Sequence, residues 1–133
     1  MKQYIGTKVI NAEPCMRADE EGYKVIYSDG YESWSPKCVF DAAYRPMSGM
    51  TFGQAIEAAK VGHKIKRSGW NGKNQYVELA SCISYKDPNG TIVNAQHDAI
   101  GNRAFAFCGT SGVQLGWSAS QADMLAEDWE IAQ

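Results

Sequence analysis

The sequence has few of the residues that build metal sites and catalytic centres. It contains two histidines, His63 and His97, and four cysteines that lie far apart without a C-x-x-C pair. Structural zinc sites need such ligands at short, regular spacings, and no Ser-His-Asp or Cys-His set can be argued from a motif. We therefore expect no metal ion, no cofactor and no catalytic residues, and we expect the thiols to be free and mostly buried.

An excess of charge and a long apolar segment are also missing. The net charge of the 133 residues is −2, which disfavours broad electrostatic binding to DNA or RNA. No apolar run approaches the length of a membrane span, and the N-terminus lacks a signal-peptide pattern. We expect a protein that contacts neither nucleic acid nor membrane and that stays in the cytoplasm of the cell making it. The length suffices for one ordinary domain or two very small ones.

The first 46 residues predict a small β-rich module with a barrel-like core. Tyr4 to Ala12 is strand-like, Gly22 to Tyr27 alternates as a half-buried strand does, and Tyr31 to Trp34 should return as its partner. Ser35 and Pro36 have the form of a helix start, with serine as the cap and proline at the first helical position. The many tyrosines of this module favour a core over a ligand surface.

Residues 50–133 predict a second domain, of α+β class. Thr51 and Gln54 have the spacing of a capping box, and the apolar residues that follow recur at helical spacing until Gly62. Short strands from Ile65 onward should form a small antiparallel sheet. A short helix near the C-terminus and a closing strand over residues 128–131 complete the predicted order.

Ser68-Gly69-Trp70-Asn71-Gly72 predicts a tight turn next to a locally basic stretch between Lys60 and Lys73. An indole can stack on a nucleobase, and an amide can bind a base edge or a ribose hydroxyl. The concentrated cations make a small anionic ligand possible. In this interpretation the ring of Trp70 lies open to solvent. The alternative is a hairpin turn whose tryptophan folds back onto the core.

The C-terminal motif runs from Trp117 to Leu125. Ser120 and Asp123 fit a helix cap and its third-position partner. The free amides at a helix start suit an anion such as a phosphate. Alternatively, Ser118 and Ser120 only cap the helix, and the carboxylate of Asp123 favours that interpretation. Asp123 could instead accept hydrogen bonds from ribose hydroxyls or a base amine.

Three separated motifs, in this order, resemble the phage Thoeris anti-defence protein of the second type. They are Met50-Thr51-Phe52-Gly53-Gln54-Ala55, Arg67-Ser68-Gly69-Trp70-Asn71-Gly72-Lys73, and the stretch from Trp117 to Trp129. The resemblance covers roughly residues 50 to 132. Residues 1 to 46 resemble, through Gly30 to Lys37, a module that precedes this domain in some phage proteins and has no firm role.

The resemblance implies a sponge rather than a catalyst. Members of the family form homotetramers that sequester glycocyclic ADP-ribose, the signal of immune TIR enzymes, and some hold cyclic dinucleotides at separate sites. It implies action in the cytoplasm of the infected bacterial host. The implied ligand-binding residues are Trp70, Asn71, Trp117, Ser118, Ser120, Asp123, Phe52 and Arg67.

Two other functions stay open at the level of the sequence. One is a phage enzyme that degrades a cyclic nucleotide signal. The other is a virion or host-interaction module whose aromatic N-terminal part is the contact surface.

Overall fold

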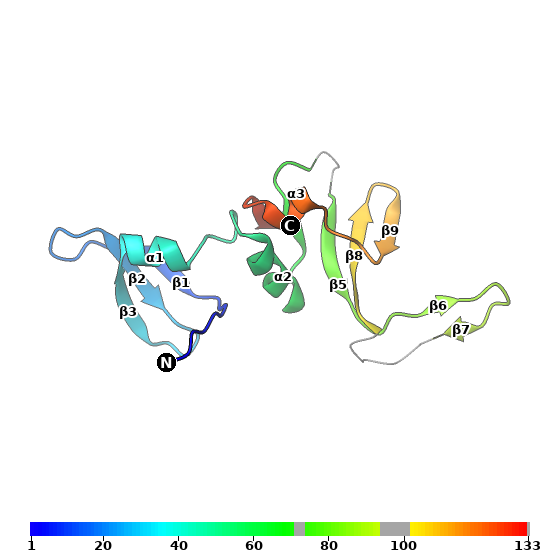
Figure 1. The fold of residues 1–133 in the computed structure, drawn as a ribbon, viewed down its shortest axis with the longest axis horizontal. Coiled ribbons are helices and arrows are strands. Elements are labelled where there is room, and N and C mark those ends of the chain that lie inside the picture. Colours follow the sequence, from blue (N-terminus) through cyan, green and yellow to red (C-terminus); the bar gives the residue numbers. More distant parts are fainter. Residues whose placement is uncertain (71–73, 94–101, 133) are drawn as a thin grey trace. The chain divides into compact units, whose positions relative to one another are not determined.

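The computed structural model describes residues 1–70, 74–93 and 102–132. The chain divides into two compact units, Met1–Pro46 and Met47–Gln133. Figure 1 shows the elements of each unit, and the two units are described one at a time.

The first unit is a three-stranded antiparallel sheet followed by a short helix. The strands β1 (Asn11–Pro14), β2 (Gly22–Ile26) and β3 (Glu32–Pro36) lie in the order β1-β2-β3. The helix α1 (Lys37–Ala43) places Phe40 between two tyrosine rings, with centroid distances of 4.0 Å to Tyr23 and 5.0 Å to Tyr44. This stack of half-buried rings joins the helix to the central strand. The expected aromatic core is met only in part, since Val25 is buried whereas Tyr4 and Tyr31 are 90% and 65% exposed.

Three expectations for the first unit are wrong. The sheet is open, with β1 and β3 as its edges, and does not close into a barrel. The strand expected from Tyr4 begins only at Asn11, and the residues before it are in no helix or strand. Ser35 does not cap α1, because the non-local pairing of β3 with β2 extends through Pro36, which is itself the N-cap.

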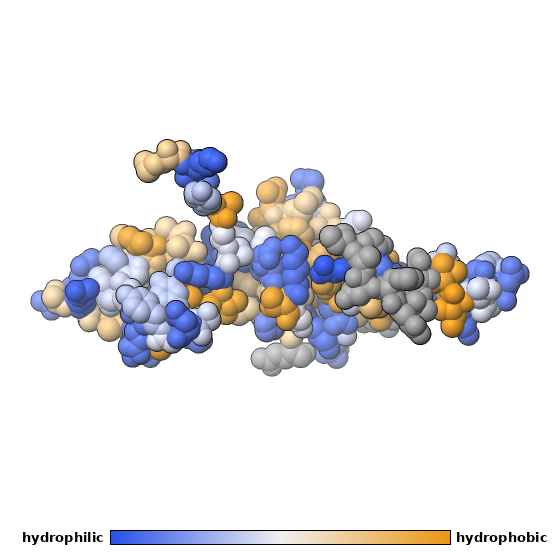
Figure 2. Space-filling model, turned by 90° about the horizontal axis from the view of Figure 1, so that it is seen from below, coloured by the Kyte–Doolittle hydropathy of each residue, from blue (hydrophilic) through white to orange (hydrophobic). Residues whose placement is uncertain are grey.

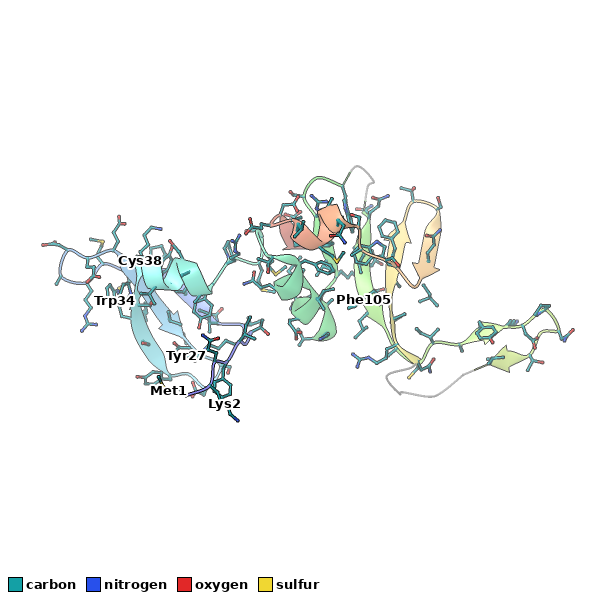
Figure 3. The ribbon with its side chains drawn as sticks, in the orientation of Figure 1. Met1, Lys2, Tyr27, Trp34, Cys38 and Phe105 are labelled. Atoms are coloured by element: carbon teal, nitrogen blue, oxygen red, sulfur yellow. The ribbon has the colours of Figure 1, made fainter. Side chains whose placement is uncertain are left out.

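The second unit is built on a five-stranded antiparallel sheet with the order β10-β4-β5-β8-β9. Its strands are β4 (Ile65–Arg67), β5 (Tyr76–Ala80), β8 (Ala104–Gly109), β9 (Gly112–Leu115) and β10 (Trp129–Ile131). The register places Ile65 opposite Val77 and Val77 opposite Phe107. Side chains on one face of this row meet the helix α2 (Phe52–Lys60), and Phe105 of β8 packs against the same core (Figure 3).

The helix α2 forms for the reasons that its sequence indicates. Its N-cap is the predicted capping box: the Gln54 N–H donates to Thr51 Oγ1 over 3.3 Å, and the Thr51 N–H donates to Gln54 Oε1 over 3.0 Å. Ala55, Ala58 and Ala59 are buried, and their small side chains let the helix approach the sheet closely. Gly62 follows the helix at a φ of +104°, a conformation that glycine adopts readily.

A short helix α3 (Gln121–Leu125) and the strand β10 close the second unit. The outer side of β10 is covered by the main chain of residues 47–50. The Met50 N–H donates to the Trp129 carbonyl over 2.7 Å, and the Ile131 N–H donates to the Met47 carbonyl over 3.3 Å. The α+β class, with a helix before the sheet and a short helix near the C-terminus, is thus confirmed.

A separate two-stranded hairpin consists of β6 (Tyr85–Lys86) and β7 (Ile92–Val93). Its turn is the expected Asp87–Gly90 segment, in which Asp87 Oδ1 accepts hydrogen bonds from the Asn89 and Thr91 amides. The strand expected from Cys82 starts only at Tyr85, because Cys82 has a φ of +53°. The loop expected over residues 94–103 lies, apart from its last two residues, outside the described residues.

The expectation of mostly buried thiols is wrong. Cys108 is buried and Cys15 half-buried, whereas Cys38 and Cys82 are exposed, and all four are free. Cys38 lies on α1, a helix without a buried residue (Figure 3).

The helices of the described residues have at most nine residues, and none could cross a lipid bilayer. On the face drawn in Figure 2, hydrophobic and hydrophilic residues are interspersed.

We predict that Thr51→Ala lowers the free energy of unfolding of the second unit by about 1 kcal/mol, because the Gln54 amide loses its acceptor at the start of α2. Urea unfolding followed by tryptophan fluorescence measures the change. Thr7→Ala is the control, since Thr7 is exposed and lies in no helix or strand. Equal stability of the two variants would contradict a stabilising cap.

Candidate functional site

Aromatic side chains from three segments of the second unit contact Trp129, which lies in a fourth segment. This residue is fully buried, and its indole Nε1 donates to the Asp123 carbonyl over 2.9 Å. Its ring centroid lies 5.5 Å from both Phe52 and Trp70 and 6.1 Å from Trp117. All three aromatic residues predicted to bind a ligand therefore contact one buried indole.

The ring of Trp70 is half-buried, not open to solvent as the sequence led us to expect. It packs edge-on against Phe107 at 5.6 Å and against Trp117 at 6.4 Å, in addition to Trp129. Part of the indole therefore belongs to the core of the second unit, and part remains accessible. The solvent-exposed tryptophan and the tryptophan folded back onto the core, the two alternatives for this turn, are thus each met in part. Asn71, the next predicted site residue, lies outside the described residues.

Arg67 joins two carboxylates of the same unit. Its Nε donates to Asp128 Oδ1 over 3.0 Å, and its NH1 donates to Asp123 Oδ1 over 3.2 Å. The Ser68 hydroxyl donates to the second oxygen of Asp128 over 3.2 Å, and the Ser68 amide donates to the Asp128 carbonyl. Arg67 and Ser68, three and two residues before Trp70, are thereby fixed in position.

These contacts hold both carboxyl groups in their ionised form. The hydrogen bonds from Arg67 and then Ser68 outweigh burial and lower the pKa of Asp128. Burial works to raise the pKa of Asp123, but the bonds from Ser120 and Arg67 together lower it more. The same two carboxylates raise the pKa of Arg67. The three side chains carry a net charge of −1, so a phosphate at Arg67 would meet two carboxylates beside the guanidinium.

Ser120 and Asp123 form the second predicted capping box. The Asp123 N–H donates to Ser120 Oγ over 3.0 Å, and the Ser120 N–H donates to Asp123 Oδ2 over 3.0 Å. A carboxylate therefore lies at the start of α3, where a ligand phosphate would have been expected. The structure favours the capping role of these two residues. Ser118, the remaining predicted residue of this motif, is exposed.

Much of the basic stretch before Trp70 is paired with acidic residues. Lys60 lies 3.0 Å from Glu57, and Lys66 lies 3.6 Å from Glu130. Lys64 places its ammonium 4.6 Å from the ring centroid of Tyr76. The lysines that lie close together in the sequence therefore do not form an anion-binding site among the described residues.

The structure thus brings together Phe52, Trp70 and Trp117 on one side and Arg67 with Asp123 on the other. Trp129, Phe107 and Asp128 also belong to this region, although the sequence does not predict a role for them. The first lies in a closing strand and the second in a wholly apolar strand, patterns that indicate burial but not a role beside a site. Asp128 binds Ser68 and Arg67, which are 60 and 61 positions away, and no local pattern could indicate such a contact.

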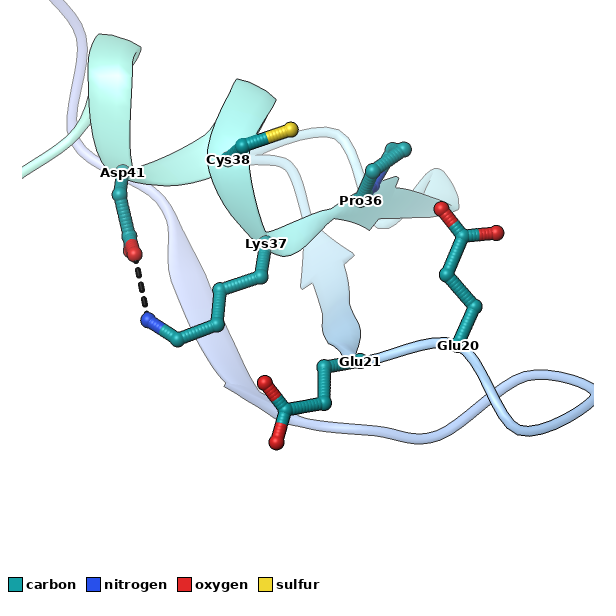
Figure 4. A pocket seen from close by; sticks show the side chains of 6 residues that line it. All are labelled: Glu20, Glu21, Pro36, Lys37, Cys38 and Asp41. Atoms are coloured by element: carbon teal, nitrogen blue, oxygen red, sulfur yellow. Dashed lines mark hydrogen bonds and ion pairs between the residues drawn. The ribbon is translucent and has the colours of Figure 1, made fainter.

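A surface hollow lies elsewhere, in the first unit. Glu20, Glu21, Pro36, Lys37, Cys38 and Asp41 line it (Figure 4). Lys37 Nζ lies 2.6 Å from Asp41 Oδ2, which raises the pKa of Lys37. None of the predicted ligand-binding residues lines this hollow. Over residues 1–70, 74–93 and 102–132, no group of three histidine, cysteine or acidic side chains could hold a metal ion.

Comparison with known proteins covers the second unit. The family model of the Thoeris anti-defense 2-like domain matches residues 50–132. A protein of Bacillus phage SP01, "Thoeris anti-defense 2", is 37% identical over 86 residues, which are 62% of this chain and 93% of the phage protein. The chain belongs to the Thoeris anti-defense 2-like family. This confirms the resemblance that the three motifs indicate and supports a role against the Thoeris defence system.

The Thoeris anti-defense 2-like domain contains the aromatic cluster and the Arg67 network in full. The matched residues begin at Met50, whose main chain covers β10, and end beyond Trp129. The candidate site therefore belongs to the part of the chain that this family shares.

We predict that Asp128→Asn reduces the loss of folding stability that the protein undergoes as the pH falls. A carboxyl group with a lowered pKa in the folded state stabilises the fold above its unfolded pKa, about 4, and this contribution is lost as pH falls through the folded value. Melting temperatures between pH 2 and pH 7 should show a smaller acid-induced decrease for the variant, and a lower value at neutral pH.

Asp41→Asn is the matched control, because the Lys37–Asp41 pair is about half exposed and lies in the other unit. If Asp128→Asn and Asp41→Asn gave the same pH profile as the unaltered protein, the Arg67 network would not contribute to stability.

Proposed function

We propose that this chain is a phage anti-defence protein that binds and sequesters glycocyclic ADP-ribose signals without cleaving them. The observation that carries the proposal is the convergence of Phe52, Trp70 and Trp117 around one buried tryptophan, within the residues matched to the family. Half-buried indoles held at fixed positions suit the stacking of a nucleobase. The protein acts in the cytoplasm of the infected bacterium, and cyclic dinucleotides are a second class of ligand.

The polar groups beside the cluster support binding rather than catalysis. Asp123 and Asp128 have lowered pKa values and accept hydrogen bonds from Arg67. A general acid at neutral pH needs a raised pKa instead. These carboxylates are therefore suited to fixing the site, and they can also accept hydrogen bonds from ribose hydroxyls.

The affinity that a sponge needs favours a site shared between subunits. Nanomolar binding corresponds to about −12 kcal/mol, whereas stacking one base supplies roughly 1–3 kcal/mol. Arg67 is already engaged with two carboxylates, so it contributes little further attraction for a diphosphate. We therefore propose a homotetramer in which more than one subunit contacts each ligand, with Asn71 among the contacts.

Ligand recovery separates sequestration from degradation. The purified protein is incubated with glycocyclic ADP-ribose, freed of unbound ligand, heated, and its supernatant is analysed by mass spectrometry. We expect intact ligand in an amount that follows the protein concentration. Recovery of cleavage products would indicate an enzyme, and recovery of no ligand would contradict the proposed function.

Trp70→Leu should weaken capture of glycocyclic ADP-ribose by roughly 5- to 150-fold, the loss expected for one stacked base. Leucine keeps part of the packing against Phe107 and Trp129 but removes the aromatic face. Isothermal titration calorimetry measures the affinity, and circular dichroism checks the fold.

The control is Trp34→Leu, which removes an indole of the first unit that donates to the Cys15 carbonyl over 2.8 Å (Figure 3). We expect this variant to retain its affinity. Equal affinity of the Trp70 variant and the unaltered protein would remove Trp70 from the site.

A further inference from the structure

The two edges of the five-stranded sheet differ. The edge at β10 is bonded along its outer side to the main chain of residues 47–50. The edge at β9 pairs with β8 alone among the described strands. One edge is therefore covered within its own unit, and the other presents main-chain groups that no described strand pairs.

The sequence of β9 lacks the features that protect exposed edges. Natural edge strands are usually protected by lysine, proline, a bulge or an inward-pointing charge. The four residues of β9 are glycine, valine, glutamine and leucine, and all are exposed. Val113 is 66% exposed and Leu115 is 51% exposed. An uncharged edge with two exposed aliphatic side chains is suited to pairing with another strand.

The register defines which side chains a pairing strand would meet. Val113 lies opposite Cys108 and Leu115 opposite Ala106, so these two aliphatic side chains share one face. Gln114 lies opposite Phe107, on the face that carries the aromatic cluster. The Gly116 amide donates to the Phe105 carbonyl. By alternation, Gln114 directs its main-chain groups toward β8, and Val113 and Leu115 direct theirs outward.

We propose that β9 pairs antiparallel with β9 of a second copy of this chain, with Gln114 facing its own copy across a two-fold axis. In this register Val113 lies opposite Leu115 of the second copy and exchanges main-chain hydrogen bonds with it. The aliphatic pairs fall on one face and the two amides on the other. The strand is uncharged, so self-pairing brings no like charges together, and this self-complementarity identifies the partner as a second copy.

The interface also makes the candidate site part of a larger surface. A two-fold axis perpendicular to the sheet joins the two sheets into one, with both aromatic clusters on the same face. The two Gln114 side chains lie between the clusters, each next to a Phe107 that contacts Trp70. The link to ligand capture rests on the proposed function, whereas the interface itself is argued from the sheet edge.

Cysteine cross-linking tests the register directly. Opposed residues in a non-hydrogen-bonded antiparallel pair have Cα atoms about 4.5 Å apart, within the range that a disulfide bridges. We expect Gln114→Cys, in a Cys38→Ser, Cys82→Ser background, to form a covalent dimer on non-reducing gels that reductant reverses. The background protein and Ile92→Cys in the same background, at a position that is 57% exposed on β7, should stay largely uncross-linked.

Charge insertion tests the interface without cysteine chemistry. Leu115→Lys should halve the mass measured by light scattering, while Ile92→Lys should leave it unchanged, with circular dichroism as the check on folding. A monomeric unaltered protein, or absence of the Gln114→Cys dimer together with an unchanged mass of Leu115→Lys, would overturn the proposal. Failure of the unaltered protein to bind glycocyclic ADP-ribose would instead refute the proposed function, since cross-linking and mass are measured without ligand.

Discussion

The burial of Trp129 is the constraint on which the second unit depends. Its main chain bonds to Met50 in both directions, its indole N–H donates to Asp123, and its ring contacts Phe52 and Trp70. One residue thereby joins the segment before α2, the helix α3 and the turn after β4. Because the indole is fully buried and its N–H has an acceptor, the position of the ring is defined. The positions of the rings that pack against it are defined by that contact.

The Arg67 network fixes the same region from its polar side. Asp128, the residue before Trp129, holds Arg67 through one carboxylate oxygen and Ser68 through the other. Arg67 also reaches Asp123, whose carbonyl accepts the bond from Trp129. The apolar contacts and the polar contacts therefore connect the same two segments, residues 67–70 and residues 123–129. A site prepared in this way would lose little conformational entropy on binding the proposed ligand, which is the condition for tight capture by few contacts.

Local patterns in the sequence predicted the elements of this unit well. Both capping boxes, the buried face of α2 and the turn at Asp87–Gly90 depend on residues within four positions of one another, and each was found where its pattern indicated. The failures involve long-range pairing. Ser35 continues a strand because β2 offers a partner, and Arg67 meets carboxylates 56 and 61 residues away in place of a free surface.

The aromatic residues of the site could be predicted from the sequence only in part. Family motifs pointed to Phe52, Trp70 and Trp117, but only the fold shows that a buried fourth ring connects them. Half-burial has a direct consequence for binding. A ring packed edge-on against its own core offers less of its surface to a base than a free indole does. For the proposed ligand, the remaining contacts must come from groups outside this cluster, since the guanidinium of Arg67 is held by Asp123 and Asp128. Under the proposed pairing, a second copy joined at the edge of the sheet is the source of such groups, and it leaves the packing around Trp129 unchanged.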